Sequence, residues 1–281
     1  MRVALDLMGG DHAPIAVIDG ALLAVDRDPT VEVILVGPPT LAADLLAERG
    51  ASTAVVAATE WVTMDEEPAR AVRAKKDATV RVIHRLVRDG EADAAVSVGS
   101  TGAVLAGAVL TLGRSTVRPA VAVVVPALKG PVVLLDAGAT SEATAEQLVE
   151  HAALGVGYAR ALGIEQPTVG LLNVGTETGK GDALRRAAHA LLTQAPLRFV
   201  GNVEAQDVAL GGTADVVVTD GFTGNVLLKG MEGATLRVAG GDLPRSAVLL
   251  GIPGVTVVGH GAADAADVAE CVLHAAALAR A

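Results

Sequence analysis

The segment from Ala214 to Lys229 combines residue types that suit the binding of an anion. It reads ADVVVTDGFTGNVLLK, so an apolar β-branched strand leads into a glycine-containing turn and then into helical apolar spacing. A helix that starts at such a turn directs unpaired backbone N–H groups, and the positive end of its dipole, at one place. Gly221 and Gly224 allow a ligand to approach closely, and Asn225 adds a side-chain amide donor. The pattern predicts a phosphate site, with an ordinary strand-to-helix turn as the alternative.

Two further side chains carry groups that could act on a bound phosphate. Lys180 stands in the glycine turn NVGTETGKG before a predicted helix, where its ammonium could pair with a phosphate; a solvent-facing lysine is the alternative. His12 follows the first predicted strand and could donate to phosphate or act as an acid; a cap on the next helix is the alternative. Asp220 and Glu204 could cap loops or orient the lysine.

Several other chemistries lack support in the sequence. No segment fits the GxGxxG dinucleotide fingerprint, and VGTETGKG departs from a P-loop because Val174 replaces the first glycine and Gly181 replaces the magnesium-binding Ser or Thr. The histidines are scattered, and no carboxylate cluster has metal-ligand spacing, so no metal is expected. The lone Cys271 lies in an apolar helical run and is interpreted as a packed helix residue. A single cysteine allows no internal disulfide, which fits a protein of a reducing compartment.

The elements that must position these groups follow an alternating pattern. Short β-rich runs alternate with Ala-rich helical runs, which predicts an α/β fold with a mostly parallel sheet covered on both faces. The predicted strands are Arg2 to Leu7, Val31 to Val36, Ala54 to Ala57, Ala94 to Val98, Ala120 to Val125, Val132 to Asp136, Thr168 to Asn173, Arg198 to Val200, Val216 to Thr219 and Val255 to Val258. The predicted helices are Ile15 to Asp26, Leu41 to Arg49, Thr79 to Arg88, Thr101 to Leu112, Ala143 to Ala161, Ala183 to Gln194, Thr223 to Val238 and Ala262 to Ala279. No linker or repeat is visible, so one continuous domain over residues 1–281 is predicted.

Glycine-rich turns follow many of the predicted strands. They are Met8 to Pro14, Ser97 to Ala103, Asp136 to Thr140, Asn173 to Gly181, Val200 to Asp207, Asp220 to Asn225 and Gly259 to Asp264. Ligands of such folds bind beyond the carboxyl ends of the strands. We therefore expect these turns to line one polar crevice.

Charge and hydropathy restrict the class of partner. A net charge of −10 and 1% aromatic residues argue against a nucleic-acid-binding protein. The apolar stretch Ala120 to Leu135 is broken by prolines and a lysine and predicts two strands rather than a membrane span, and no export signal is visible. Between Pro68 and Arg88 basic residues dominate, with Asp77 as the only acid. This run is either a solvated helix face or a surface that docks an acidic partner.

Six motifs in a fixed order connect these features to a known family. VALDLMGGDHAP, MDEEPARAVRAKKDATV, SVGSTGAVLAGA, VGLLNVGTETGKG, FVGNVEAQDV and ADVVVTDGFTGNVLLKGMEG follow one another between Arg2 and about Gly233, and GVTVVGHGAADA extends the match weakly. In these motifs the sequence resembles the bacterial phosphate acyltransferases, the PlsX family.

The resemblance implies an activity and a fold. The activity is transfer of a long-chain acyl group from acyl carrier protein to inorganic phosphate, which gives an acyl phosphate for phospholipid synthesis. The fold is a three-layer α/β/α sandwich similar to phosphotransacetylase and isopropylmalate dehydrogenase. The resemblance also implies a homodimer without metal or organic cofactor, a cytoplasmic location with contact to the membrane surface, and a downstream glycerol-3-phosphate acyltransferase that uses acyl phosphate.

Carried over motif by motif, the resemblance assigns roles to particular residues. The essential lysine and asparagine of the family match Lys180 and Asn225, and His12 is a candidate proton donor. Candidate phosphate- or substrate-binding residues are Gly9, Gly10, Asp11, Ser100, Thr101, Gly102, Thr140, Asn173, Gly175, Gly221, Thr223 and Gly224. Candidate carrier-docking residues, which would attract an acidic carrier protein, are Arg73, Lys75, Lys76, Arg81 and Arg85.

The sequence departs from the family pattern at Ser100, at Thr140 and after Gly233, and two alternative functions stay open. Ser100 and Thr140 each stand where the family usually has Asn, and the helical stretch after Gly233 is shortened to ATLRVA, in a region that serves dimerisation and membrane contact in the family. One alternative is a phosphotransacetylase-like enzyme that uses short-chain acyl-coenzyme A. The other is a non-catalytic relative that binds phosphate or carrier protein.

Overall fold

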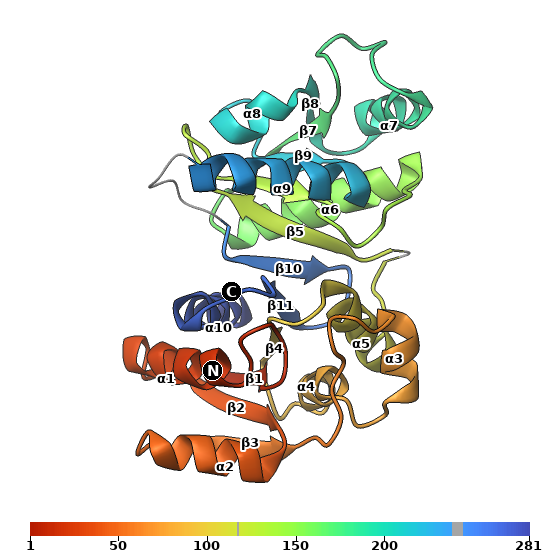
Figure 1. The fold of residues 1–281 in the computed structure, drawn as a ribbon. Coiled ribbons are helices and arrows are strands. Elements are labelled where there is room, and N and C mark those ends of the chain that lie inside the picture. Colours follow the sequence, from red (N-terminus) through yellow and green to blue (C-terminus); the bar gives the residue numbers. More distant parts are fainter. Residues whose placement is uncertain (117, 238–243) are drawn as a thin grey trace. The chain divides into compact units, whose positions relative to one another are not determined.

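The chain folds into two compact α/β units (Figure 1). The computed structural model describes residues 1–116, 118–237 and 244–281. The first unit comprises residues 1–114 and 245–281, and the second comprises residues 115–244. One continuous domain over residues 1–281 stays a prediction.

The first unit carries six strands in the order β3-β2-β1-β4-β11-β10. The strands are β1 (Arg2–Asp6), β2 (Glu32–Gly37), β3 (Ala54–Ala57), β4 (Ala94–Ser97), β10 (Ser246–Leu250) and β11 (Val255–Gly259). The helices are α1 (Ile15–Arg27), α2 (Pro39–Glu48), α3 (Pro68–Ala74), α4 (Thr79–Arg88), α5 (Thr101–Leu112) and α10 (Ala265–Arg280). The strand pairs are parallel except for β10 with β11.

The core of the first unit forms where helices cover these strands. Ile34, Val36, Val82 and Ile83 share one buried cluster, which joins β2 to α4. Helices α1 and α10 pack against each other, and a β-carbon on Gly20 of α1 would lie only 2.5 Å from Val268 Cβ of α10. Apolar surface on both sides of the strands is thus removed from water, which is the main stabilising term of such a fold.

The second unit carries five strands in the order β5-β6-β9-β7-β8. The strands are β5 (Ala120–Val125), β6 (Val132–Leu135), β7 (Thr168–Leu172), β8 (Arg198–Val203) and β9 (Val216–Val218). The helices are α6 (Ala145–Ala161), α7 (Ala183–Gln194), α8 (Ala205–Leu210) and α9 (Gly221–Arg237). β5 pairs with β6 antiparallel, and the other pairs are parallel.

The predicted α/β class with a mostly parallel sheet is confirmed, and so are the two strands in residues 120–135. Three elements were not predicted, namely α3, α8 and β10, which have seven, six and five residues. The two helices contain too few turns for apolar spacing to show, whereas β10 is no shorter than several strands that were predicted. The predicted end of the helix at Val238, and part of the ATLRVA stretch, lie outside the described residues.

Candidate active site

Asp136 follows β6 directly and holds the turn after this strand, which contacts the start of α9. Its carboxylate is fully buried and accepts hydrogen bonds from three consecutive backbone amides, those of Gly138 at 3.0 Å, Ala139 at 2.9 Å and Thr140 at 2.6 Å. The Thr140 carbonyl in turn accepts from the Gly221 amide at 2.8 Å. The sequence analysis did not select Asp136, although an acid placed directly after a fully apolar strand was a usable signal.

The start of α9 is mostly paired within the protein. The amide of Gly221 donates to Thr140, that of Thr223 to the Asp220 carboxylate at 2.9 Å, and that of Gly224 to the Asp220 carbonyl at 3.0 Å. The expectation that this helix directs unpaired N–H groups at a ligand is therefore wrong for these three positions. Asn225 lies at the surface of the same turn, and its side-chain amide donates to the Ala137 carbonyl at 3.2 Å.

Lys180 ends an exposed turn that leads into α7. Its carbonyl accepts from the Asn173 side-chain amide at 3.1 Å, and its own amide donates to the Glu177 carbonyl at 3.0 Å. Gly175 is buried, and a β-carbon there would lie 2.9 Å from a Glu177 carboxylate oxygen and 3.3 Å from Lys180 Cγ. The backbone of the turn is thus fixed, while the Lys180 side chain is exposed and able to meet a ligand.

Arg185 is a charged residue of this site that the sequence analysis missed. It lies in the first turn of α7, and only 12% of its side chain is exposed. Its guanidinium pairs with Asp182 at 3.0 Å and with Asp220, and it also donates to the hydroxyls of Thr219 at 3.1 Å and Thr223 at 2.9 Å. No motif marks this arginine, because its partners at the start of α9 lie more than thirty residues further along the chain.

The two acids with open roles are both helix caps in the structure. Asp220 caps α9 and pairs with Arg185 rather than with Lys180, and Glu204 precedes α8, where its amide donates to Asp207 at 2.8 Å. Burial on its own raises the pKa of Asp220, but hydrogen bonds from Thr223 and the charge of Arg185 outweigh it and hold this pKa below its usual value. Asp220 is therefore a structural anion rather than a proton donor.

A cavity of about 980 Å³ opens beside these residues. It lies at the carboxyl ends of β7 and β8 and is lined by Leu172, Asn173, Val174, Gly181, Asp182, Arg185, Glu204, Ala205, Gln206, Thr223, Val226 and Leu227. Val174 and Val226 expose 79% and 56% of their surface. The cavity therefore offers accessible apolar side chains next to a polar, ion-paired wall.

The loops after β1, β4 and β11 meet in the first unit. Asp11 donates its amide to the Gly261 carbonyl at 2.8 Å, and a β-carbon on Gly9 would lie 2.8 Å from the Gly99 nitrogen. Gly10 has a φ of 97°, which favours glycine, and His12 is exposed beside it. The glycine turns of each unit are thus brought together within that unit, and a single shared crevice stays a prediction.

A buried pair of polar side chains anchors these loops. Ser97 Oγ donates to Asp6 Oδ2 at 2.8 Å and accepts from the Gly99 amide at 3.1 Å. Burial raises the pKa of Asp6, while hydrogen bonds including that from Ser97 oppose the shift. The pair joins the end of β1 to the end of β4.

The start of α5 differs from that of α9. Ser100 precedes the helix without a side-chain cap, and its carbonyl accepts from Ala103 at 2.9 Å and Val104 at 3.0 Å. Among the described residues the amides of Thr101 and Gly102 have no hydrogen-bond acceptor. Two donors and the helix dipole thus remain available to an anion at this turn.

The predicted carrier-docking surface lies on α3, α4 and the turn between them. Its charge is partly neutralised, because Lys75 pairs with Glu66 at 2.6 Å and Arg85 with Asp77 at 3.3 Å. Arg73 and Lys76 are exposed, and Arg81 is half-buried with a guanidinium nitrogen 3.5 Å from the Val72 carbonyl. Among the five predicted docking residues, the exposed positive charge therefore lies on Arg73 and Lys76.

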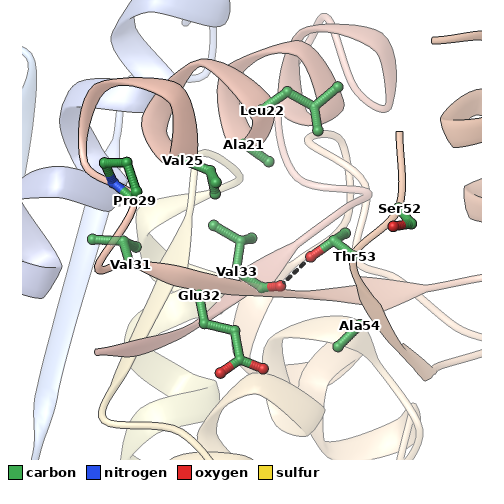
Figure 2. A pocket seen from close by; sticks show the side chains of 10 residues that line it. All are labelled: Ala21, Leu22, Val25, Pro29, Val31, Glu32, Val33, Ser52, Thr53 and Ala54. Carbon is green, nitrogen blue, oxygen red and sulfur yellow. Dashed lines mark hydrogen bonds between the residues drawn. The ribbon is translucent and has the colours of Figure 1, made fainter. Parts of the chain in front are cut away.

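Two further cavities lie at the opposite, amino-terminal edges of the strands. Figure 2 shows the one between the end of α1 and the starts of β2 and β3, of about 390 Å³, where Glu32 points away from Leu22 and Val25. The other, of about 590 Å³, lies at the starts of β7 and β8 and contains Arg160 and Arg198. Neither contains a residue that the sequence analysis selected.

Cys271 is confirmed as a packed residue of α10. It is fully buried, and burial, with Asp267 and Glu270 nearby, raises the pKa of its thiol to about 12. A thiol in this state is a poor nucleophile.

The chain is similar to known proteins both in its fold and in its sequence. A phosphotransacetylase from Streptococcus pyogenes superposes with a TM-score of 0.71 at 20% identity over 100% of this chain and 94% of that one, so the fold is shared. A family model described as "Fatty acid synthesis protein" matches residues 1–240. A phosphate acyltransferase of Desulfitobacterium hafniense (strain Y51) is 51% identical over 83% of this chain and 71% of its own length, and one of Heliobacterium modesticaldum is 42% identical over 94% and 90%.

The architecture is that of an α/β protein whose mostly parallel strands end in glycine turns. Within that class, the chain belongs to the phosphate acyltransferase family, and the resemblance seen in the six motifs is confirmed. None of the helices in the described ranges is long and apolar enough to cross a lipid bilayer.

Proposed function

We propose that this chain transfers a long-chain acyl group from acyl carrier protein to inorganic phosphate. The observation that carries the proposal is that Lys180 and Asn225 are both exposed and lie in segments that follow β7 and β9, two neighbouring parallel strands of the second unit. An ammonium and an amide donor suit a reaction in which negative charge moves from phosphate to a carbonyl oxygen.

The proposed step forms one bond and breaks one. A phosphate oxygen attacks the thioester carbonyl carbon, the C–S bond breaks, and the carrier thiolate leaves and takes up a proton. Lys180 neutralises the phosphate, and Asn225 donates to the carbonyl oxygen as it becomes negative. The thiolate is a tolerable leaving group, so a proton from His12 would assist the step without being essential.

The paired start of α9 changes the roles proposed for its residues. Gly221, Thr223 and Gly224 already use their amides within the protein, so we propose that they position Asn225 rather than bind phosphate. In the first unit, the unpaired amides of Thr101 and Gly102 stay proposed donors to an anion.

The cavity beside Arg185 is the proposed place for the uncharged arm of the donor. Its arginine is already paired with Asp182 and Asp220, and Glu204 adds a further negative charge, so an anion is not favoured there. The accessible Val174 and Val226 would contact apolar parts of the arm. The carrier itself, which is acidic, would be steered by Arg73 and Lys76.

The remaining partners follow from the same proposal. The product would be consumed by a glycerol-3-phosphate acyltransferase that uses acyl phosphate. We also propose that the chain forms a homodimer, which gel filtration of the purified chain would test. Contact with the membrane surface is a further proposal, which sedimentation with lipid vesicles would test.

The deciding experiment supplies phosphate and compares acyl donors. The chain is incubated with acyl carrier proteins and acyl-coenzyme A thioesters of several chain lengths, and acyl phosphate is trapped with hydroxylamine. We expect the highest kcat/KM with long-chain acyl carrier protein. A preference for acetyl-coenzyme A would indicate a phosphotransacetylase instead, and binding of carrier or phosphate without any product would indicate a non-catalytic relative.

A further inference from the structure

One guanidinium connects the starts of two helices in the second unit. On one side, Arg185 Nη1 pairs with Asp182, the residue that caps α7. On the other side, its Nη2 reaches Asp220 and the hydroxyls of Thr219 and Thr223 at the start of α9. The guanidinium therefore joins an acid in each of the two helix caps.

The stem of the same side chain supports the Lys180 turn. A β-carbon on Gly181, the residue after Lys180, would lie 2.7 Å from Arg185 Cβ, so the turn packs directly on the arginine. Gly181 has a φ of 91°, and the Asn173 side-chain amide donates to the Lys180 carbonyl. The backbone at Lys180 and Gly181 is thus held by contacts with Asn173 and Arg185.

The two acids bound by Arg185 differ in their access to water. The Asp220 side chain is 6% exposed, whereas that of Asp182 is 59% exposed. Without the arginine, water can solvate Asp182, but Asp220 would remain a buried carboxylate whose cation is missing. The α9 side of the network therefore depends on Arg185 far more than the α7 side does.

We propose that Arg185 is a positioning residue that holds the Lys180 turn and the Asn225 helix in a fixed relation to each other. The proposal rests on the proposed function, because Lys180 and Asn225 are the groups assigned to the reaction. Arg185 acts through them, since both Nη nitrogens of its guanidinium already bind groups of the protein, namely Asp182, Asp220 and two threonines.

The kinetic test compares a variant that removes the charge of Arg185 with a variant that keeps a positive charge at this position. In Arg185→Gln we expect kcat to fall and KM for phosphate to rise, with a combined loss in kcat/KM of about 10- to 100-fold, because both reactive groups lose their relative placement. A loss of folded protein alone would lower kcat and leave KM unchanged. Arg185→Lys keeps a charge but has no planar fork to span both acids, so it should recover activity only in part. The control is Arg198→Gln at the far edge of the sheet, which should behave as wild type.

A second measurement does not need activity. Hydrogen exchange of the amides in residues 219–226 should become at least tenfold faster in Arg185→Gln and in Asp220→Asn. It should change little in Asp182→Asn, since Asn caps helices as well as Asp does and Asp182 is already solvated. Unchanged exchange in the first two variants, or wild-type kcat and KM in Arg185→Gln, would overturn the proposal. If wild-type protein makes no acyl phosphate while exchange responds as expected, the network stands and the assigned chemistry fails.

Discussion

The carbonyl oxygen of Asp136 occupies the space beside Gly224 where any other residue would place its β-carbon. The ideal β-carbon position on Gly224 is only 2.0 Å from that oxygen. The start of α9 and the turn that follows β6 are thus in direct backbone contact, and Asn225, the next residue, is placed by this contact.

Gly224→Ala should therefore disrupt the second unit. Because the clash is with backbone rather than with a flexible side chain, we expect a loss of more than about 3 kcal/mol in unfolding free energy. Gly230→Ala is the matched control, since this glycine lies in the same helix with no atom within 4 Å of its β-carbon position. It should stabilise the protein by about 0.5–1 kcal/mol. Equal behaviour of the two variants in denaturant unfolding would contradict the assigned contact.

Lys180→Ala and Asn225→Ala test the reactive groups directly. Each should lower kcat/KM for acyl phosphate formation by about 100- to 1,000-fold, because each removes a charge or a donor from the developing negative charge. Neither side chain is buried, so the melting temperature should change little. Wild-type rates in both variants would refute the site.

His12→Ala should have a smaller effect than either of these. A thiolate leaves without obligatory protonation, so we expect a loss of about tenfold or less. Rates measured with donors whose thiols differ in acidity would check the role, because the loss should grow as the leaving thiol becomes less acidic. A loss that is independent of the leaving group would assign His12 to phosphate binding instead.

The docking surface predicts a dependence on salt. Reversing the exposed charges with Arg73→Glu and Lys76→Glu should raise KM for acyl carrier protein and weaken its dependence on ionic strength, while kcat changes little. Lys75→Gln is the comparison, since Lys75 is already paired with Glu66 and contributes less to the field. An unchanged KM in the reversed variants would place the carrier elsewhere.

His84 makes the stability of the first unit depend on pH. It is fully buried on α4, and burial lowers its pKa from 6.5 to about 4 despite a hydrogen bond to the Val80 carbonyl. The folded state keeps this histidine neutral while the unfolded chain takes up a proton, so stability is lost as pH falls from about 6.5 to about 4. The loss amounts to about 3 kcal/mol at the acid end. In His84→Leu this part of the pH dependence of unfolding should vanish, and in His12→Leu it should remain.

The sequence was sufficient for features that depend on local order. The strand, turn and helix between Ala214 and Lys229, and the glycine turn of Lys180, were predicted because period, glycine and strand composition act over a few residues. Arg185 could not be found in this way, since a paired arginine and a solvent-facing arginine on a helix have the same sequence context. The occupied amides of α9 were also hidden, because the Thr140 carbonyl that accepts from Gly221 comes from a distant turn.

The chain order of the first unit has a consequence for its synthesis. Residues 1–114 lack α10 and β11, which come only from residues 245–281, after the whole second unit. Helix α10 covers α1, β1 and β4, so their apolar surfaces stay open while residues 115–244, which are continuous, can already fold. During synthesis, the first unit therefore stays unfinished, with apolar surface exposed, until helix α10 has emerged from the ribosome.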